Sequence, residues 1–229
     1  MNRFTSQILS AAKNGKIYKS PCEHLILNPT LSQETYNTLY NKFPSMLDES
    51  LLGNYPKGMK KSSLCMVEHW HPGFSKWKGK DYSFWQSILH KLSLQQLGKE
   101  LLQVFGIEGE NTDNPTCHLN LDHKGSLGFG SHCEDGTSLF LILYIPRGDV
   151  MDSEGTHIYT PKGHKGITHT RYNTKDTIEY FNVEKVVPFK PNTCLVIPYS
   201  KKAWHGVGPV NTDGRQVLII RWLNSVTTY

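Results

Sequence analysis

Residues 131–145, SHCEDGTSLFLILYI, set polar and metal-ligating side chains directly before an apolar run. The run itself, residues 139–145, is far shorter than the roughly 18 residues that a bilayer span needs. Glycine precedes it and proline follows it, as is common at the ends of a strand. We therefore predict a buried β-strand over 138–145 and a shorter strand over 128–133 before it.

Similar short runs, separated by Gly, Pro, Asn and Asp, continue through the second half of the chain. Further strands are predicted over 116–121, 156–159, 193–197, 205–210 and 216–223. Seven or more short strands without intervening helices favour a sandwich or barrel, most simply a double-sheet jelly roll. We interpret residues 162–176, which hold four Lys or Arg, two His and two Gly, as an insertion between strands.

The first half of the sequence has a helical pattern. Apolar side chains recur on one helical face over 31–43, and Pro44 ends that helix because proline lacks the backbone N–H donor. A strand is predicted over 24–27, a loop-like stretch over 48–79, and helices over 83–90 and 93–105. The sequence thus predicts a mainly β fold, a double-stranded β-helix (jelly roll, cupin-like) with N-terminal helices packed on the barrel.

The composition fits one globular domain over 1–229, with a helical part over 1–109 and the jelly-roll core over 110–229. Hydrophobic residues make up 38% of the chain and charged residues 20%, which excludes a disordered chain. The net charge of +5 is too small for a dedicated nucleic-acid binder and suits an anionic small ligand. The N-terminus lacks the apolar core of a secretory signal, and no membrane segment is visible, so a cytoplasmic location is expected. The five cysteines form no C-x-x-C pair, so neither structural zinc nor a disulfide framework is expected.

Two short segments hold candidate metal ligands. His132 and Glu134 are two residues apart at the end of a predicted strand, so they point to the same face while Asp135 points away. On this parity we favour Glu134 over Asp135 as the carboxylate ligand. His205 opens another predicted strand. Two histidines and one carboxylate give the facial arrangement that binds Fe(II) and leaves open positions for other ligands.

An arginine follows the second histidine at a fixed distance along the chain. Arg215 lies ten residues after His205, at the start of the last predicted strand. Its planar guanidinium offers two parallel donors to a carboxylate, which makes it a candidate anchor for the carboxylate of a ligand.

These segments resemble the Fe(II)- and 2-oxoglutarate-dependent oxygenases, and in particular their prolyl-hydroxylase-like branch. The motifs that carry the resemblance are HLILNPTLSQETYNTLYNKFP, SFWQSILHKLS, SHCEDGTSLFLILYIP, GTHIYTPKG, NTCLVIPYSKKAWHGVGPV and GRQVLIIRW. The resemblance implies that His132, Glu134 and His205 are the iron ligands and that Arg215 anchors 2-oxoglutarate. It also implies that the Tyr144 phenol hydrogen-bonds the same distal carboxylate. The chain departs from this branch in having Glu, not Asp, as the carboxylate.

A second arginine lies six residues beyond Arg215, which returns it to the same face of the strand. We hypothesise that this residue, Arg221, binds a carboxylate of the substrate or the inner end of 2-oxoglutarate. The paired arginines also partly resemble a strand of the DNA-alkylation-repair dioxygenases.

The resemblance implies a dioxygenase that uses dioxygen, yields succinate and CO2, and hydroxylates an amino acid or amino-acid residue, with ascorbate as a candidate cofactor. Its partner would be a small-molecule or peptide substrate, and nucleic acid is not expected. Two alternatives stay open, an oxidative demethylase of a nucleobase and a non-catalytic cupin-like metal-binding protein. The remaining polar residues near the site, His118, Asn120 and His123, are interpreted as hydrogen-bonded structural residues. Trp204 is expected to pack in the barrel wall and Cys133 to point away from the metal.

Overall fold

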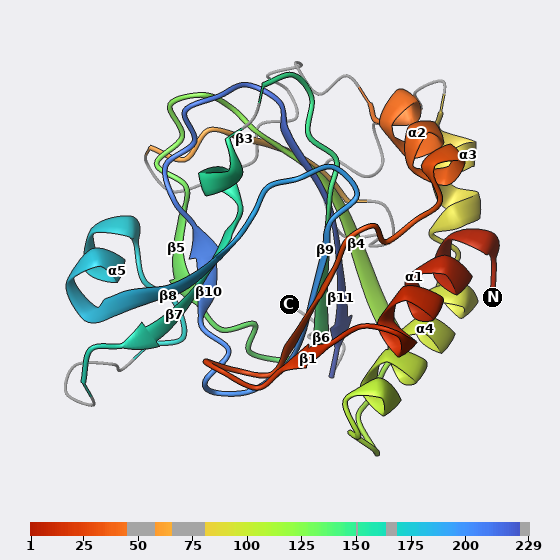
Figure 1. The fold of residues 1–229 in the computed structure, drawn as a ribbon, viewed down its shortest axis with the longest axis horizontal. Helices are drawn as coiled ribbons and strands as arrows, with labels where there is room; N and C mark the ends of the chain where they lie inside the picture. Colours follow the sequence, from red (N-terminus) through yellow and green to blue (C-terminus); the bar gives the residue numbers. More distant parts are fainter. Residues whose placement is uncertain (45–57, 66–80, 150, 164–168, 225–229) are drawn as a thin grey trace.

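The strands of the computed structural model form two antiparallel sheets, one of seven strands and one of four (Figure 1). The structure describes residues 1–44, 58–65, 81–149, 151–163 and 169–224. The large sheet has the order β1-β2-β9-β6-β11-β4-β3, and the small sheet has the order β5-β10-β7-β8. The strands are β1 (Ile17–Tyr18), β2 (His24–Leu27), β3 (Lys61–Cys65), β4 (Asn114–Asp122), β5 (Phe129–His132), β6 (Thr137–Tyr144), β7 (Thr156–Pro161), β8 (Phe181–Val187), β9 (Cys194–Pro198), β10 (His205–Val207) and β11 (Arg215–Leu223).

From β4 onward, the chain passes repeatedly between the two sheets. Strands β4, β6, β9 and β11 lie in the large sheet, and strands β5, β7, β8 and β10 lie in the small one. Every pairing within either sheet is antiparallel. The predicted antiparallel, mainly β core is confirmed, and the two sheets enclose the space where the site lies.

Strand β6 contributes to two separate cores. All eight of its residues are buried, because each face of the strand is covered. Leu139, Leu141 and Leu143 pack with the apolar residues of the helices. Phe140 and Ile142 point the other way and pack with residues of the small sheet. A strand covered on both faces reads as a continuous apolar run, which explains the sequence LFLILY.

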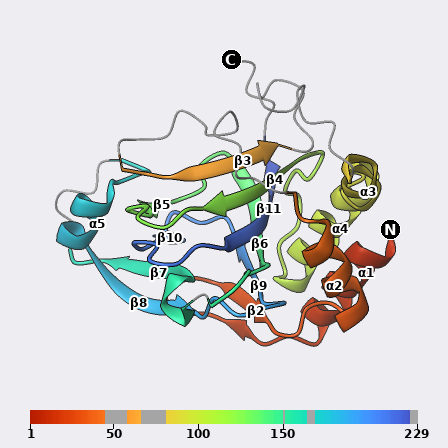
Figure 2. The same cartoon turned by 90° about the horizontal axis from the view of Figure 1, so that it is seen from above.

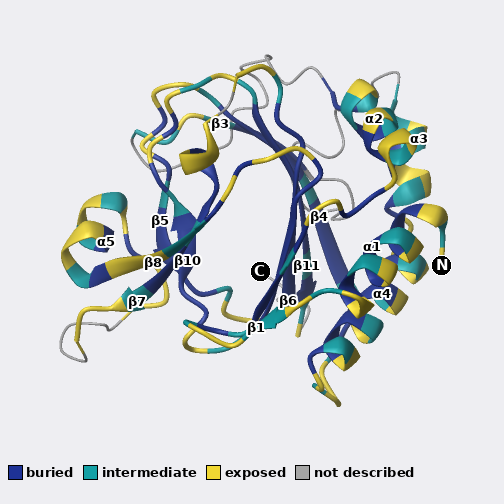
Figure 3. Cartoon of the chain, in the orientation of Figure 1, coloured by how far each residue is buried: buried dark blue, intermediate teal, exposed yellow. Residues whose placement is uncertain are grey.

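Four helices cover the outer face of the large sheet, as the view from above shows (Figure 2). Their outward faces are exposed while the strands beneath are buried (Figure 3). Asn2 caps the first helix by accepting a hydrogen bond from the backbone N–H of Thr5 at 3.0 Å. The helices are α1 (Arg3–Lys13), α2 (Gln33–Lys42), α3 (Tyr82–Ile88) and α4 (Lys91–Val104), and α5 (Thr174–Tyr180) lies beside the small sheet.

A glycine brings α4 close to the sheet. A Cβ atom at Gly98 would lie 2.4 Å from Nε1 of Trp222 on β11, too close for any other residue. The same Trp222 nitrogen donates a hydrogen bond of 2.8 Å to the backbone oxygen of Leu94. Gly98 therefore serves the packing of helix on sheet, although glycine lowers helix propensity.

Five elements differ from the sequence expectations, and the shortest of them is the unpredicted strand β1. Helix α1 was not predicted, although its buried residues Phe4, Ile8 and Ala12 repeat every four positions. Strand β3 lies inside the stretch expected to be a loop, and its sequence KSSLC gives no apolar alternation because part of it faces a polar cavity. Most of the remaining stretch 48–79 lies outside the described residues. Helix α5 and strand β8 arise around the expected insertion 162–176, so the strands of the core do not follow one another without helices.

Within the described ranges, no helix combines the length and apolarity needed to cross a membrane. Cys22, Cys133 and Cys194 are buried free thiols.

Candidate metal centre

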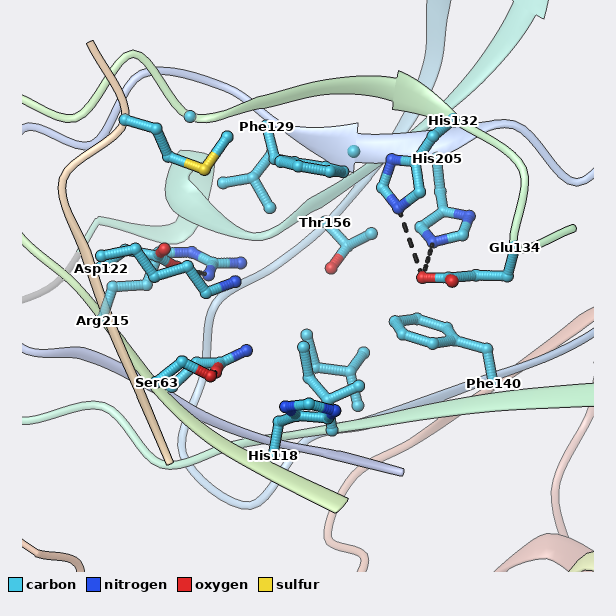
Figure 4. A pocket seen from close by; sticks show the side chains of 18 of the residues that line it. Ser63, His118, Asp122, Phe129, His132, Glu134, Phe140, Thr156, His205 and Arg215 are labelled. Atoms are coloured by element: carbon cyan, nitrogen blue, oxygen red, sulfur yellow. Dashed lines mark hydrogen bonds and ion pairs between the residues drawn. The ribbon is translucent and has the colours of Figure 1, made fainter. Parts of the chain in front are cut away.

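The two predicted histidines meet across neighbouring strands of the small sheet. His132 ends β5, His205 begins β10, and the two are paired directly opposite each other in the antiparallel register. Glu134 follows β5 and turns its carboxylate toward both rings (Figure 4). Its Oε1 lies 3.4 Å from Nε2 of His132 and 3.8 Å from Nε2 of His205. The three residues form a group whose ligand atoms all lie within 4.8 Å of one another, and such a group could hold a metal ion.

Both histidines are held by backbone oxygens two residues earlier in the chain. Nδ1 of His132 lies 3.0 Å from the oxygen of Gly130, and Nδ1 of His205 lies 3.0 Å from the oxygen of Ala203. Because a carbonyl oxygen only accepts, each Nδ1 carries the proton and each Nε2 keeps its lone pair. Neutral imidazoles fixed in this way present Nε2 as a metal ligand.

The electrostatics of the group also suit a metal. Burial, together with the neighbouring His205, lowers the pKa of His132 to about 4, so this ring is neutral at pH 7. Burial alone would raise the pKa of Glu134, but the Arg221 guanidinium beside it holds the pKa well below its usual range. The site thus combines a neutral His132 ring and an ionised Glu134 carboxylate with the ring of His205.

Two ligand atoms of this group have no hydrogen-bond partner among the described residues. They are Oε1 of Glu134 and Nε2 of His205, and both are buried. A buried polar atom without a partner is costly, and a cation between these atoms would remove that cost. By contrast, Asp135 is exposed and accepts a hydrogen bond of 3.2 Å from the Tyr199 hydroxyl. The geometry therefore brings Glu134, and not Asp135, to the two histidines.

Arg221 contacts the carboxylate of Glu134 directly. Its Nε lies 3.0 Å from Oε2 of Glu134, on the opposite carboxylate oxygen from the one that faces the histidines. Arg221 and Arg215 both point into the cavity from β11, as their spacing predicted. The sequence did not predict the pairing with Glu134, and contact of Arg221 with substrate or 2-oxoglutarate stays a prediction.

The metal group lies at one end of a cavity of about 360 Å³, and Arg215 lies at the other (Figure 4). Arg215 is only 1% exposed. Its Nε donates a hydrogen bond of 2.6 Å to the backbone oxygen of Glu154, and its Nη1 pairs with the carboxylate of Asp122. Its Nη2 has no partner among the described residues, which leaves one buried donor available to a ligand in the cavity.

A lysine continues this charged end of the cavity. Lys61, Asp122 and Arg215 lie side by side across β3, β4 and β11, because Asp122 is paired in register with both of the others. Burial and the nearby Arg215 lower the pKa of Lys61, while Asp122 opposes the shift. Sequence reasoning missed Lys61 and Asp122, since only the strand register shows that they flank Arg215.

Tyr144 lies near Arg215, but its hydroxyl is already engaged. It accepts a hydrogen bond of 3.0 Å from the backbone N–H of Thr156 and donates one of 2.8 Å to the Thr156 hydroxyl. Thr156, and not Tyr144, lines the cavity. The expected contact of Tyr144 with a bound carboxylate therefore stays a prediction, and Thr156 is the residue that separates the phenol from the cavity.

Of the three other polar residues predicted near the site, two line the cavity and one does not. His118 and Asn120 line the cavity, and the side-chain amide of Asn120 lies 2.6 Å from Oγ of Ser63. His123 lies 2.7 Å from Oγ of Ser62. Asn120 and His123 are thus hydrogen-bonded, as predicted, although Asn120 also faces the cavity.

Behind the histidines, Cys133 and Trp204 belong to a buried cluster with Tyr159, Tyr172 and Phe181. Trp204 packs as expected. Cys133 also packs there, its thiol donates a hydrogen bond of 3.8 Å to the backbone oxygen of Lys201, and burial raises the pKa of the thiol to about 12.

Two histidines and a carboxylate facing a cavity are the type of site that non-haem Fe(II) oxygenases use. No protein-family model matches the sequence, and no curated protein matches it either. Solved structures do share its fold. A prolyl-4-hydroxylase from Pseudomonas putida has a TM-score of 0.55 at 12% identity, with 98% of this chain and 100% of that chain covered.

Two further solved structures agree with this match. A Trichoplax adhaerens prolyl hydroxylase, in complex with a peptide of hypoxia inducible factor, has a TM-score of 0.55 at 13% identity and covers 97% of this chain and 90% of its own. The epimerase SnoN, in complex with Fe3+, alpha ketoglutarate and nogalamycin RO, has a TM-score of 0.55 at 12% identity, with 96% of this chain and 83% of that chain covered. The chain therefore has the fold of the 2-oxoglutarate- and Fe(II)-dependent oxygenases, prolyl hydroxylases among them.

Proposed function

We propose that this protein is an Fe(II)- and 2-oxoglutarate-dependent dioxygenase that hydroxylates an amino acid or amino-acid residue, with succinate and CO2 as co-products. One observation carries the proposal. The cavity has a two-histidine, one-carboxylate group at one end and a buried arginine with an unpartnered donor at the other. A 2-oxo acid with a distal carboxylate fits such a cavity, because its two ends need a metal and a cation respectively.

Each residue of the site has a role in this proposal. His132, Glu134 and His205, which all line the cavity, would hold the ferrous ion. When bound, the ion supplies the activation of dioxygen and the oxidative decarboxylation of 2-oxoglutarate, which no side chain can perform. Arg215 binds the distal carboxylate through Nη2. Strands β4 to β11 form the double-stranded β-helix that fixes these residues relative to one another.

Arg221 has a supporting role in the same site. Its guanidinium keeps Glu134 ionised and fixes Oε2, so that Oε1 stays turned toward the histidines. A carboxylate that is oriented before the metal arrives loses less conformational freedom on binding it.

Hydroxylation of an amino acid or residue is supported by the prolyl hydroxylases among the proteins of the same fold. The test is succinate formation from 2-oxoglutarate with Fe(II) and ascorbate, measured with and without a library of amino acids, peptides and methylated nucleobases. We expect succinate from the wild-type protein, stimulation by a member of the amino-acid or peptide set, and a product heavier by one oxygen atom. Loss of a methyl group from a nucleobase would instead identify a demethylase, and metal binding without succinate would identify a non-catalytic binding protein.

A further inference from the structure

We infer that Arg171 anchors an anionic group of the substrate, so that the substrate is a small acid whose carboxylate or phosphate lies close to the carbon that is oxidised. The inference rests on the proposed function and adds a substrate class to it. It begins from the placement of residues 169–172, which belong to the stretch that the sequence presented as an insertion.

Backbone hydrogen bonds fix this segment against the metal site. The N–H of Cys133 donates to the oxygen of Thr170, and the N–H of Tyr172 donates to the oxygen of Ser131, both at 2.9 Å. Arg171 is thereby paired in an antiparallel bridge with His132 itself. Tyr172 is buried in the aromatic cluster behind the site, which prevents the segment from turning over.

The pairing decides the direction of the Arg171 side chain. Residues directly opposite each other in an antiparallel pair point to the same face, and His132 points into the cavity. Arg171 accordingly lines the cavity, and its guanidinium lies 4.8 Å from the centre of the Phe129 ring. The residue is exposed, so its charge lies where the cavity opens to solvent and where a substrate would enter.

The charges that line the cavity favour an anionic substrate. Among the described lining residues there are four cations, Lys61, Arg171, Arg215 and Arg221, and two carboxylates, Asp122 and Glu134, so four minus two leaves +2. A ferrous ion and a 2-oxoglutarate dianion together add no net charge, which leaves the excess for the substrate. Arg215 and Arg221 pair with the two carboxylates, and Lys61 lies beside Asp122. Of the four cations, Arg171 is the one that is exposed.

A guanidinium recognises carboxylates and phosphates through two parallel N–H donors. A free amino acid could meet Arg171 through its α-carboxylate while its side chain lies toward the metal, and a phosphorylated metabolite could do so through its phosphate. The cavity of about 360 Å³ has to hold 2-oxoglutarate as well, which suits a small molecule.

The experiment measures substrate-stimulated succinate formation by the Fe(II)-loaded protein. The panel contains the common free amino acids, the corresponding amino-acid amides, and phosphoserine beside serine. We expect stimulation by at least one acid, with a KM at least about ten-fold lower than that of its neutral counterpart, as for a lost charged contact of about 1.4 kcal/mol or more. The amino-acid arm and the phosphoserine arm distinguish a carboxylate from a phosphate.

Three variants test the residue itself. We expect Arg171→Gln to raise the KM of the stimulating acid at least about ten-fold, Arg171→Lys to recover most of that loss, and Lys175→Gln to change nothing. Lys175 is the matched control because it is an exposed cation on the adjacent helix and does not line the cavity. Binding of Fe(II) and of 2-oxoglutarate should be retained in all three variants, which shows that they fold, and only Lys175→Gln is expected to leave every step of the reaction unchanged.

The proposed function and this inference fail in different ways. A wild-type protein that forms no succinate with Fe(II) contradicts the proposed function and removes the basis of the inference. Succinate formation that is stimulated equally by acids and amides, stimulated by no acid in the panel, or unaffected by Arg171→Gln overturns the inference and leaves the proposed function standing.

Discussion

The two ends of the cavity are built in different ways. At the metal end, the histidines are held by the backbone oxygens of Gly130 and Ala203, each two residues earlier in the chain. The opposite end is called the carboxylate end, because Arg215 is proposed to bind the distal carboxylate of 2-oxoglutarate there. Arg215 is held by Asp122, which is 93 residues away, and by the backbone of Glu154, which is 61 residues away. The orientation of each metal-end side chain is thus set by a local contact, although β5 and β10 must pair to bring the two rings together, whereas the orientation of Arg215 is set by residues far away in the chain.

This difference has consequences for stability as well as for binding. The metal end leaves its unpartnered atoms to be satisfied by a ligand, whereas the carboxylate end compensates most of its buried charge within the protein. Substitutions at the metal end should therefore mainly affect metal binding, and substitutions at the carboxylate end should affect both the co-substrate and the fold.

The largest effect is expected from removing a histidine at the metal end. His132→Ala or His205→Ala should lower the affinity for Fe(II) by more than about 100-fold and abolish succinate formation, since even residues that only orient metal ligands contribute about 10- to 100-fold. An anaerobic Fe(II) titration measures the change. Asp135→Ala is the matched control. Because Asp135 is exposed, this variant should keep the Fe(II) affinity within about two-fold of the wild type, whereas Glu134→Ala should lower the affinity further than that. Full iron binding in either histidine variant would rule out this ligand set.

At the carboxylate end, Arg215→Met should weaken the binding of 2-oxoglutarate by about 100-fold or more while Fe(II) binding is retained, since losing a buried charged partner typically costs about 2–5 kcal/mol. The affinity for 2-oxopentanoate, which lacks the distal carboxylate, should not change. The variant also removes the buried ion-pair partner of Asp122, so the free energy of unfolding should fall by about 3–5 kcal/mol. Adding Asp122→Asn should restore much of that stability without restoring 2-oxoglutarate binding. An equal loss for both 2-oxo acids would show that Arg215 does not recognise the distal carboxylate.

The metal end should also show a pH dependence in the metal-free protein. The pKa of His132 is about 4 in the fold and 6.5 in the unfolded chain, so the unfolded chain binds more protons between these values. The contribution of His132 to stability is therefore present at pH 7 and falls by about 2 kcal/mol on going to pH 5. Urea unfolding at both pH values, compared between the wild type and His132→Gln, isolates this contribution. The same pH slope in both proteins would contradict it.

A smaller effect is expected at Glu154, which supports Arg215 from behind. The carboxylate of this residue accepts hydrogen bonds from the backbone N–H groups of Asn211 and Thr212 at 2.6 and 2.9 Å. Glu154→Gln should lower the free energy of unfolding by about 1–2 kcal/mol and weaken the binding of 2-oxoglutarate a few-fold, measured by urea unfolding and by co-substrate titration. Asp152 is an exposed carboxylate at the other end of the short 3₁₀ helix that Glu154 closes, Asp152–Glu154. Asp152→Asn should change neither quantity, and an equal effect of the two substitutions would argue against a role of Glu154 in positioning Arg215.

The same contrast explains what the sequence could and could not predict. His132 and Glu134 were identifiable because residues two apart share a face of a strand. His205 was identifiable because it opens a predicted strand within a short motif. Lys61 and Asp122 were not identifiable, since only the register of β3, β4 and β11 places them beside Arg215.

Two further features of the site were not predicted, also because they depend on contacts between distant segments. Arg171 lay in a stretch that reads as a solvated loop, and only its bridge to His132 brings it to the cavity. The pairing of Arg221 with Glu134 depends on how closely two strands of different sheets approach each other, which periodicity does not encode. The apolar pattern did predict most strands and three of the helices, because burial on one or both faces leaves a direct trace in the sequence.

The most direct test of the two-ended cavity is an anaerobic titration of the Fe(II)-loaded protein with 2-oxoglutarate, followed by the visible absorption that arises when a 2-oxo acid chelates ferrous iron. The wild type should develop this absorption at saturation, His132→Ala should not develop it, and Arg215→Met should need about 100-fold more 2-oxoglutarate to reach it. Binding of 2-oxoglutarate with the same affinity whether or not Fe(II) and Arg215 are present would contradict the account.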